Sequence, residues 1–169
     1  VAAGNASTAH GRGNNANGGS SVALGLGNTT DLLGVNSSAI GVVNTAAGED
    51  SSAIGRGNGA LGVQSSAVGF ANEATVMGSS AFGNSNSATG VNSTAVGFSN
   101  QAAMQDSSAI GFDNFANGVG ASAVGYFNNA RAQFSAAVGY DNDADAFGSS
   151  ALGSSNQATG VVSTAVGAS

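Results

Sequence analysis

Apolar and small polar residues recur along this chain in a short phrase with a fixed spacing. The phrase Ser-Ser-Ala-Ile-Gly at residues 51–55 has close copies fourteen residues away in both directions, and each copy ends in Gly. A fixed short period of this kind indicates one small unit stacked on itself. One two-residue insertion interrupts the spacing. The glycines that end the phrases are Gly11, Gly25, Gly41, Gly55, Gly69, Gly83, Gly97, Gly111, Gly125, Gly139, Gly153 and Gly167.

Each unit consists of two halves of seven residues. The first half reads Ser-x-Ala-φ-Gly-x-x, where φ is apolar, and the second reads Asn-x-Ala-x-Gly-x-x. The first Ser is present in eleven of twelve copies, with Ala121 the exception, and the Asn in all eleven copies from Asn14 to Asn156. Asn and Ser at fixed turn positions hydrogen-bond to nearby backbone, so stacked copies are expected to form ladders.

The Gly of the second half is replaced in four copies, which predicts a different turn geometry at those places. The replacing residues are Val76, Met104, Ala132 and Ala146.

The repeat predicts strands rather than helices. Gly every seven residues, together with abundant Ser and Asn, is unfavourable in a helix interior. A half-unit suits a strand of about five residues followed by a two-residue turn. Two strands and two turns then form one flat coil, and successive coils pair in parallel. The fold class is therefore all-β, a parallel β-roll of about twelve fourteen-residue coils.

Strand parity predicts which side chains point inward. In the second half Ala recurs, while the next position varies from Asn17 to Leu61 and Arg131, so it must face water. The Ala columns of both halves therefore face inward. The apolar φ column is then predicted to face outward: His10, Leu24, Ile40, Ile54, Val68, Phe82, Val96, Ile110, Val124, Val138, Leu152 and Val166.

A continuous apolar stripe on the outside of a thin roll predicts that other copies of the chain cover it. Parallel rolls around an axis, each with its φ column turned inward, would do so. Symmetry closes such an assembly as a dimer, a trimer or a larger ring, and periodicity leaves the number open.

Composition narrows the function classes. The 169 residues include three Lys and Arg, nine Asp and Glu, no Cys and no Pro, with a net charge of −6. A nucleic-acid binder needs a basic face, which this chain lacks. Absence of Cys excludes disulfides and thiolate metal sites. There is no apolar run long enough for a membrane helix, and we expect no direct membrane insertion of this segment.

The repeated phrases resemble the head repeats of trimeric autotransporter adhesins of the YadA type. The resemblance rests on Ser-Ala-Ile-Gly at residues 52–55 and Ser-Thr-Ala-Val-Gly at residues 93–97, and it extends from about Ser7 to Gly167. It implies a left-handed roll, a parallel homotrimer and one YadA-like head domain over residues 1–169.

The same resemblance implies a place and a role for the chain. Heads of this family are displayed on the outer membrane of Gram-negative bacteria, so a C-terminal anchor region outside this sequence is expected. The implied function is attachment to host matrix proteins such as collagen, fibronectin or laminin, to cell-surface receptors, or to other surfaces. The resemblance names no single ligand.

Two features are candidate ligand surfaces. Leu32 and Leu33 lie in the two-residue insertion, which predicts a bulge that is either a recognition loop or a neutral feature. An aromatic column follows the main Gly and is either a strip for a protein partner or a seal at the edge of the subunit interface. The column consists of Phe70, Phe98, Phe112, Tyr126 and Tyr140.

Ion binding is the weaker interpretation of the titratable residues. Three copies of His10 could meet on a symmetry axis, although a polar residue tolerated in the first coil is favoured. Asp141, Asp143 and Asp145 alternate along the chain, but the Gly-Gly-x-Gly-x-Asp signature of calcium rolls is absent. A solvated acidic face is favoured, and no cofactor or metal is expected.

The leading function is a cell-surface adhesin head. A structural spacer that projects another domain is the alternative, and an ice-binding solenoid is less favoured because Thr is scattered. Enzyme activity is not expected, since one His and no placed base cannot build a catalytic triad at any of the many Ser residues.

Overall fold

The computed structural model describes residues 1–168, and the chain divides into two compact units, Val1–Ser85 and Asn86–Ser169. Each unit is a parallel β-solenoid in which long and short strands alternate along the chain. Together they contain about twelve coils of about fourteen residues, which confirms the all-β solenoid. The prediction of one domain over residues 1–169 stays a prediction.

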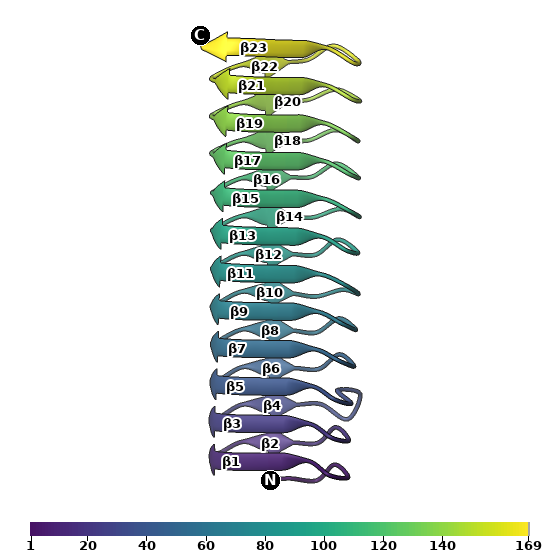
Figure 1. The fold of residues 1–169 in the computed structure, drawn as a ribbon, viewed down its shortest axis with the longest axis vertical. Helices are drawn as coiled ribbons and strands as arrows, with labels where there is room; N and C mark the ends of the chain where they lie inside the picture. The colour runs from purple at the N-terminus through teal and green to yellow at the C-terminus, as the bar shows by residue number, and fades with distance from the viewer. Residues whose placement is uncertain (169) are drawn as a thin grey trace. The chain divides into compact units, whose positions relative to one another are not determined.

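In the first unit, strands of one kind pair in parallel in chain order (Figure 1). The long strands are β1 (Thr8–Arg12), β3 (Val22–Leu26), β5 (Ser38–Val42), β7 (Ser52–Arg56), β9 (Ser66–Phe70) and β11 (Ser80–Asn84). The short strands are β2 (Asn15–Ala16), β4 (Thr29–Thr30), β6 (Thr45–Ala46), β8 (Gly59–Ala60) and β10 (Glu73–Ala74).

The second unit repeats this arrangement. Its long strands are β13 (Thr94–Phe98), β15 (Ser108–Phe112), β17 (Ser122–Tyr126), β19 (Ala136–Tyr140), β21 (Ser150–Ser154) and β23 (Thr164–Ala168). Its short strands are β12 (Ser87–Ala88), β14 (Gln101–Ala102), β16 (Phe115–Ala116), β18 (Asn129–Ala130), β20 (Asp143–Ala144) and β22 (Gln157–Ala158).

Strand length in the second half differs from the prediction. The long strands have five residues as expected, but the strands of the second half have only two. A turn takes up the rest of that half, as shown by the backbone N–H of Ser65, which donates to the carbonyl of Gly62 at 3.2 Å. Ser65 therefore bonds within its own coil, while other residues of the turn still bond to a neighbouring coil, as Gln64 N does to the carbonyl of Glu49 at 2.8 Å.

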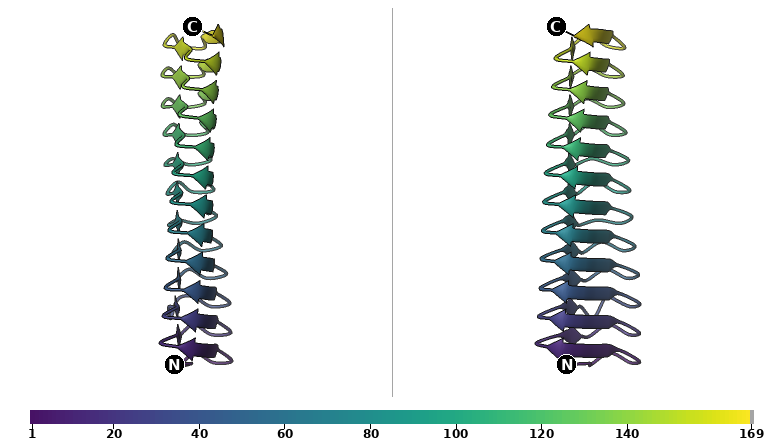
Figure 2. Two further views of the ribbon diagram at one scale, coloured as in Figure 1. Left: turned by 90° about the vertical axis from the view of Figure 1, so that its left-hand side faces the viewer. Right: turned by 60° about the vertical axis from the view of Figure 1, so that its left-hand side comes forward.

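Alanine fills the interior of each coil, as parity predicts. Ala53 of β7 and Ala60 of β8 are both fully buried, and the same holds for nearly every Ala in these two columns. Figure 2 shows the reason, since in each unit the long strands lie on one side of the coils and the short strands on the other. Small side chains fill the space between the two strands, and in one coil the fully buried Thr30 takes the place of Ala.

The Asn ladder expected from the sequence is present and buried. Asn114 is fully buried, and its side-chain amide donates to Asn100 Oδ1 at 2.9 Å and to the carbonyl oxygens of Ile110 at 3.1 Å and Gly125 at 2.8 Å. Its own Oδ1 accepts from the backbone N–H and the amide of Asn128, both at 3.0 Å. Each Asn thus ties three successive coils together.

The main Gly is required by both conformation and space. Gly41 has φ of +121°, a region that L side chains rarely adopt. A Cβ built at Gly41 would also overlap with the carbonyl oxygen of Gly55 in the next coil and lie 3.1 Å from Asn44 Nδ2. This contact explains why no other residue occupies the column.

The prediction of a different geometry where Val76, Met104, Ala132 and Ala146 replace Gly is wrong. Ser79 N donates to the carbonyl of Val76 at 3.2 Å, as Ser51 N does to Gly48 at 3.3 Å. Neither Gly48 nor any of the four replacing residues has a positive φ, so the φ region and the turn hydrogen bond are kept. A Cβ at Gly48 would overlap with the carbonyl oxygen of Gly62, so a side chain in this column requires a local displacement against the next coil.

Removal of one rung of the ladder is expected to destabilise the solenoid. The change Asn114→Ala leaves buried donors and acceptors unpaired, and we expect it to lower the free energy of unfolding by about 3 kcal/mol. Gln101→Ala, on an outward and partly exposed position, is the matched control and should cost less than about 0.5 kcal/mol. Urea denaturation followed by circular dichroism measures both, and equal losses would contradict the role of the ladder.

Several turn residues other than Gly adopt the left-handed region, among them Val43 with φ of 55°. This conformation costs a branched L residue about 1–2 kcal/mol. Because the Val43 side chain is 61 % exposed, little packing is lost when it is removed. We expect Val43→Gly to raise the free energy of unfolding by about 1 kcal/mol, after the greater unfolded-state entropy of Gly is subtracted.

Val42→Gly is the control for this prediction. Val42 ends β5 without a positive φ, so the same substitution there should lower the free energy of unfolding. Thermal unfolding of the two variants measures both effects. If both variants are less stable than the parent, residue 43 carries no strain.

Candidate interaction surfaces

The φ column faces outward, as predicted, and a single chain covers it only in part. Ile54 is 39 % exposed and Ile110 40 %, although both lie in the middle of five-residue strands. Phe82 and Val166 are also exposed, and the other members are half-buried: Leu24, Ile40, Val68, Val96, Val124, Val138 and Leu152. Register between long strands places each φ residue beside the next, as with Ile40 and Ile54.

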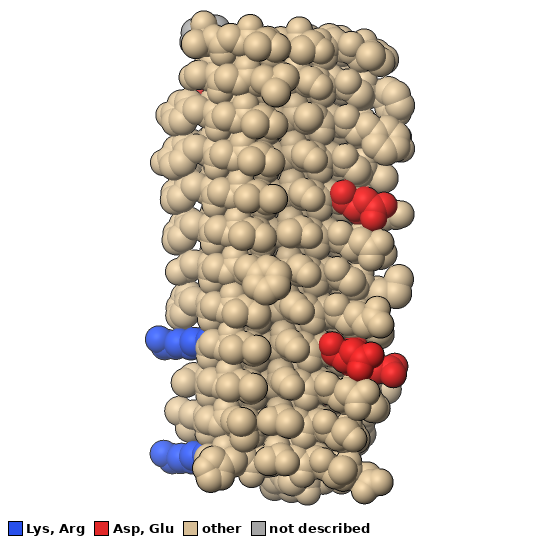
Figure 3. Space-filling model, in the orientation of Figure 1, with Lys and Arg blue, Asp and Glu red and all other residues tan. Residues whose placement is uncertain are grey.

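The face that carries the φ column is nearly uncharged. Figure 3 looks onto the long strands and shows basic side chains at one margin, acidic side chains at the other and none between them. A Ser or Thr column and the φ column occupy the middle of each unit, as Ser52 and Ile54 do on β7. An apolar centre without charge is suited to burial against another protein surface.

The last residues of the long strands form what we call the strand-end column, which includes the predicted aromatic residues. In the second unit their rings stack in register, with ring centroids 5.1 Å apart for Phe98 and Phe112, 4.7 Å for Phe112 and Tyr126, and 5.5 Å for Tyr126 and Tyr140. Phe127 lies edge-on to Tyr126 at 4.4 Å. The expected aromatic ladder is confirmed there.

In the first unit the strand-end column contains fewer aromatic residues. Phe70 is 44 % exposed, and the guanidinium carbon of Arg56 lies 5.5 Å from its ring centroid. Arg56 thus lies over an aromatic face, a favourable arrangement for a cation.

The two-residue insertion forms the predicted bulge in the turn between β4 and β5, which protrudes in Figure 1. Leu32 is 72 % exposed and Leu33 78 %. The backbone N–H of Leu32 donates to Asp31 Oδ1 at 2.7 Å, and Gly34 N donates to the carbonyl of Asp31 at 2.9 Å. The bulge is therefore an ordered turn with two apolar side chains in solvent.

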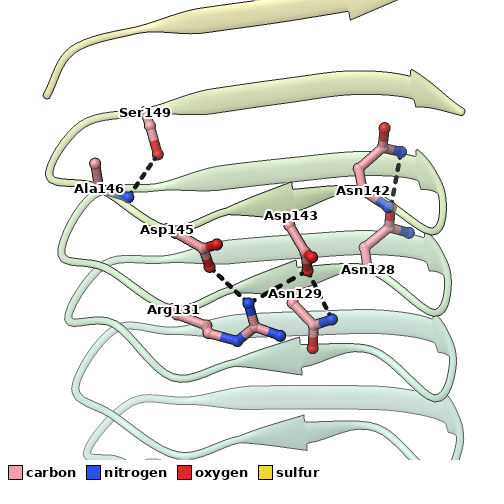
Figure 4. A network of polar contacts seen from close by, with 8 residues as sticks. All are labelled: Asn128, Asn129, Arg131, Asn142, Asp143, Asp145, Ala146 and Ser149. Atoms are coloured by element: carbon pink, nitrogen blue, oxygen red, sulfur yellow. Dashed lines mark hydrogen bonds and ion pairs between the residues drawn. The ribbon is translucent and has the colours of Figure 1, made fainter. Parts of the chain in front are cut away.

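The short-strand face is polar, and in the second unit it holds a charged network (Figure 4). Arg131 Nη1 donates to Asp145 Oδ1 at 2.7 Å and lies 3.5 Å from Asp143 Oδ1. Asn129 also donates to Asp143 Oδ1, at 2.9 Å. The hydrogen bond from Arg131 to Asp145, aided by the charges of both carboxylates, raises the pKa of Arg131 above its usual value.

The family described as "YadA head domain repeat (2 copies)" matches residues 33–58, 60–86, 88–114, 116–142 and 144–169, which is most of the chain. The chain belongs to the YadA head family. Among curated proteins, none matches this YadA head. Heads of this family come from trimeric autotransporter adhesins, which are exposed on the bacterial surface.

The titratable residues considered as ion ligands do not form a cluster in this YadA head. His10 is exposed at the φ position of β1, and within residues 1–168 no three His, Asp or Glu side chains gather as metal ligands. Asp143 and Asp145 already bind Arg131, and Asp141 lies in a turn with φ of 54°. In the described part of the chain, no helix could span a bilayer.

Sequence reasoning missed two contacts. The pairing of Arg131 with Asp145 could have been found, because the two residues are fourteen positions apart in one outward column. The left-handed φ of 58° at Phe127 also had a signal, because Gly13, Gly27 and Gly57 occupy the same column, but the edge-on contact of its ring had none.

Proposed function

We propose that the chain is an adhesin head that works as a parallel, left-handed homotrimer displayed on the outer membrane of a bacterium. The φ column carries the proposal. It is apolar, partly exposed in the single chain and free of charge at its centre. Complete burial of one Val or Ile contributes about 1.5–3 kcal/mol, so partial burial repeated in every coil supports a stable assembly. The number three comes from the family.

In this assembly the long-strand faces turn toward the axis. The surfaces left for a ligand are the polar short-strand face and the bulge with Leu32 and Leu33. The predicted partners are matrix proteins such as collagen, fibronectin and laminin, cell-surface receptors or other surfaces. The strand-end column lies beside the φ column on the long-strand face, which favours its interpretation as a seal at the interface over that as a ligand strip.

A charge in the φ column is expected to separate the subunits. Ile110→Asp would place one carboxylate per chain in the apolar centre of the interface, where an unpaired charge is strongly unfavourable. The control is Ala103→Asp, which adds the same charge to a partly exposed position after the short strand β14. Sedimentation velocity should show the control as an oligomer and Ile110→Asp as a smaller species. A monomeric parent protein would refute the assembly.

Attachment is tested with the parent head on immobilised collagen, fibronectin and laminin and on abiotic surfaces. Surface plasmon resonance should detect binding to at least one of them, and absence of binding to every surface and to host cells would contradict the adhesin role.

The spacer alternative is distinguished from a binding head by deleting one coil at a time, for example residues 107–120. A binding head should lose adhesion when a particular coil is removed, whereas a spacer tolerates every deletion.

A further inference from the structure

The two ends of strand β7 carry opposite charges. Glu49 lies in the turn that precedes the strand, and Arg56 is its last residue. Both side chains are exposed, and within residues 1–168 neither takes part in an ion pair. In the first unit these two residues thus place an acidic group and a basic group at the two margins of the long-strand face, in one coil (Figure 3).

Glu49 belongs to a column of its own, which we call the turn column. Each member stands seven residues before a member of the strand-end column and precedes the same long strand. The turn column consists of Asn5, Gly19, Val35, Glu49, Val63, Met77, Val91, Gln105, Val119, Gln133, Phe147 and Val161.

The two columns match in character in several coils of each unit. In the first unit the apolar Val35 precedes the strand that ends in Val42, and Val63 precedes the strand that ends in Phe70. All four of these side chains are at least 37 % exposed. In the second unit the corresponding pairs are Val91 with Phe98 and Val119 with Tyr126. Glu49 is the one charged residue of the turn column, and it corresponds to Arg56, of opposite sign. The other charged member of the strand-end column, Arg12, corresponds to the uncharged Asn5.

The match is not apolar in every coil. Gln105 and Gln133 correspond to Phe112 and Tyr140, where an amide can lie against a ring. Met77 corresponds to Asn84, and Phe147 to Ser154.

Members of a pair cannot touch within one chain. The five residues of β7 alone span roughly 13 Å. Arg56 is the last of them, and Glu49 lies before the first. Rotation about an axis parallel to the solenoid keeps every residue at its own height. In a parallel ring, the end of β7 in one copy therefore comes to the level of the beginning of β7 in the next copy, whereas antiparallel copies would bring different coils together.

We propose that the turn column of one copy packs against the strand-end column of the next, with Glu49 facing Arg56 across each interface. The inference rests on the proposed assembly and names the surfaces that meet in it. Opposite charges at one level and apolar pairs at several others favour the parallel, in-register arrangement and oppose a shift by one coil. A shift of that kind would place Arg56 against Val35 or Val63.

Engineered disulfides test the pairing, and the chain has no Cys of its own. In the double variant Glu49→Cys with Arg56→Cys, a bond within one chain is impossible, because the Cα atoms lie farther apart than the roughly 7 Å limit. Mild oxidation of the assembled protein should therefore convert most of it into covalently linked oligomers on a non-reducing gel. Each single variant should remain a single chain on the same gel.

Arg12→Cys combined with Glu49→Cys is the matched control. Arg12 ends β1, three coils from β7 in the same unit, so its level differs by roughly 14 Å. This pair should not cross-link. Cross-linking of the control to the same extent as the test pair would overturn the proposed register.

Charge reversal provides a second readout without new bonds. Glu49→Arg and Arg56→Glu should each lower the temperature at which the oligomer dissociates, and the combined variant should recover the parent value. If the parent sediments as an oligomer but neither cross-linking nor recovery occurs, the pairing is wrong while the assembly stands. If the parent sediments as a monomer, the proposed assembly fails and the pairing with it.

Discussion

The distance between the two strands of a coil governs this structure. Ala53 and Ala60 are both fully buried, and the largest side chains buried to the same degree are Asn, Thr and Ser, so the interior has no room for a large apolar side chain. The distance between successive coils is as tight, because a Cβ at Gly41 would overlap with the backbone of the next coil. With such an interior, burial of large apolar side chains cannot stabilise a single chain. Backbone pairing and the ladder of buried Asn side chains take over that role.

This constraint also explains the outer surface. Large apolar residues are excluded from the inside, and those that the chain retains must lie outside, where Ile54, Ile110 and their counterparts form a stripe. In the proposed assembly the hydrophobic burial of the chain takes place on association rather than on folding, and the main apolar contacts form between copies.

Much of the fold could be predicted from the sequence because the same residue types recur at the same position in every copy of the repeat. A single Ala or Ile has no decisive meaning, but eleven or twelve copies in register fix parity, ladders and the outward stripe. Local backbone detail was less accessible. The two-residue length of β8 depends on turn hydrogen bonds that repeat counting does not register, and the left-handed conformation of Val43 and Phe127 is indicated only by the Gly residues of their column. Ligand surfaces were the least predictable, since binding residues need not follow the period.

The turn before β5 shows how loosely the ladder depends on loop length. Asn28 and Asn44 are sixteen residues apart rather than fourteen, yet the amide of Asn44 still donates to Asn28 Oδ1 at 2.9 Å. The coil therefore closes on the Asn, whatever the length of the turn on the opposite side. This solenoid can accept foreign peptides at that edge without loss of register, which makes the segment around Leu32 and Leu33 a natural place to graft a new recognition loop.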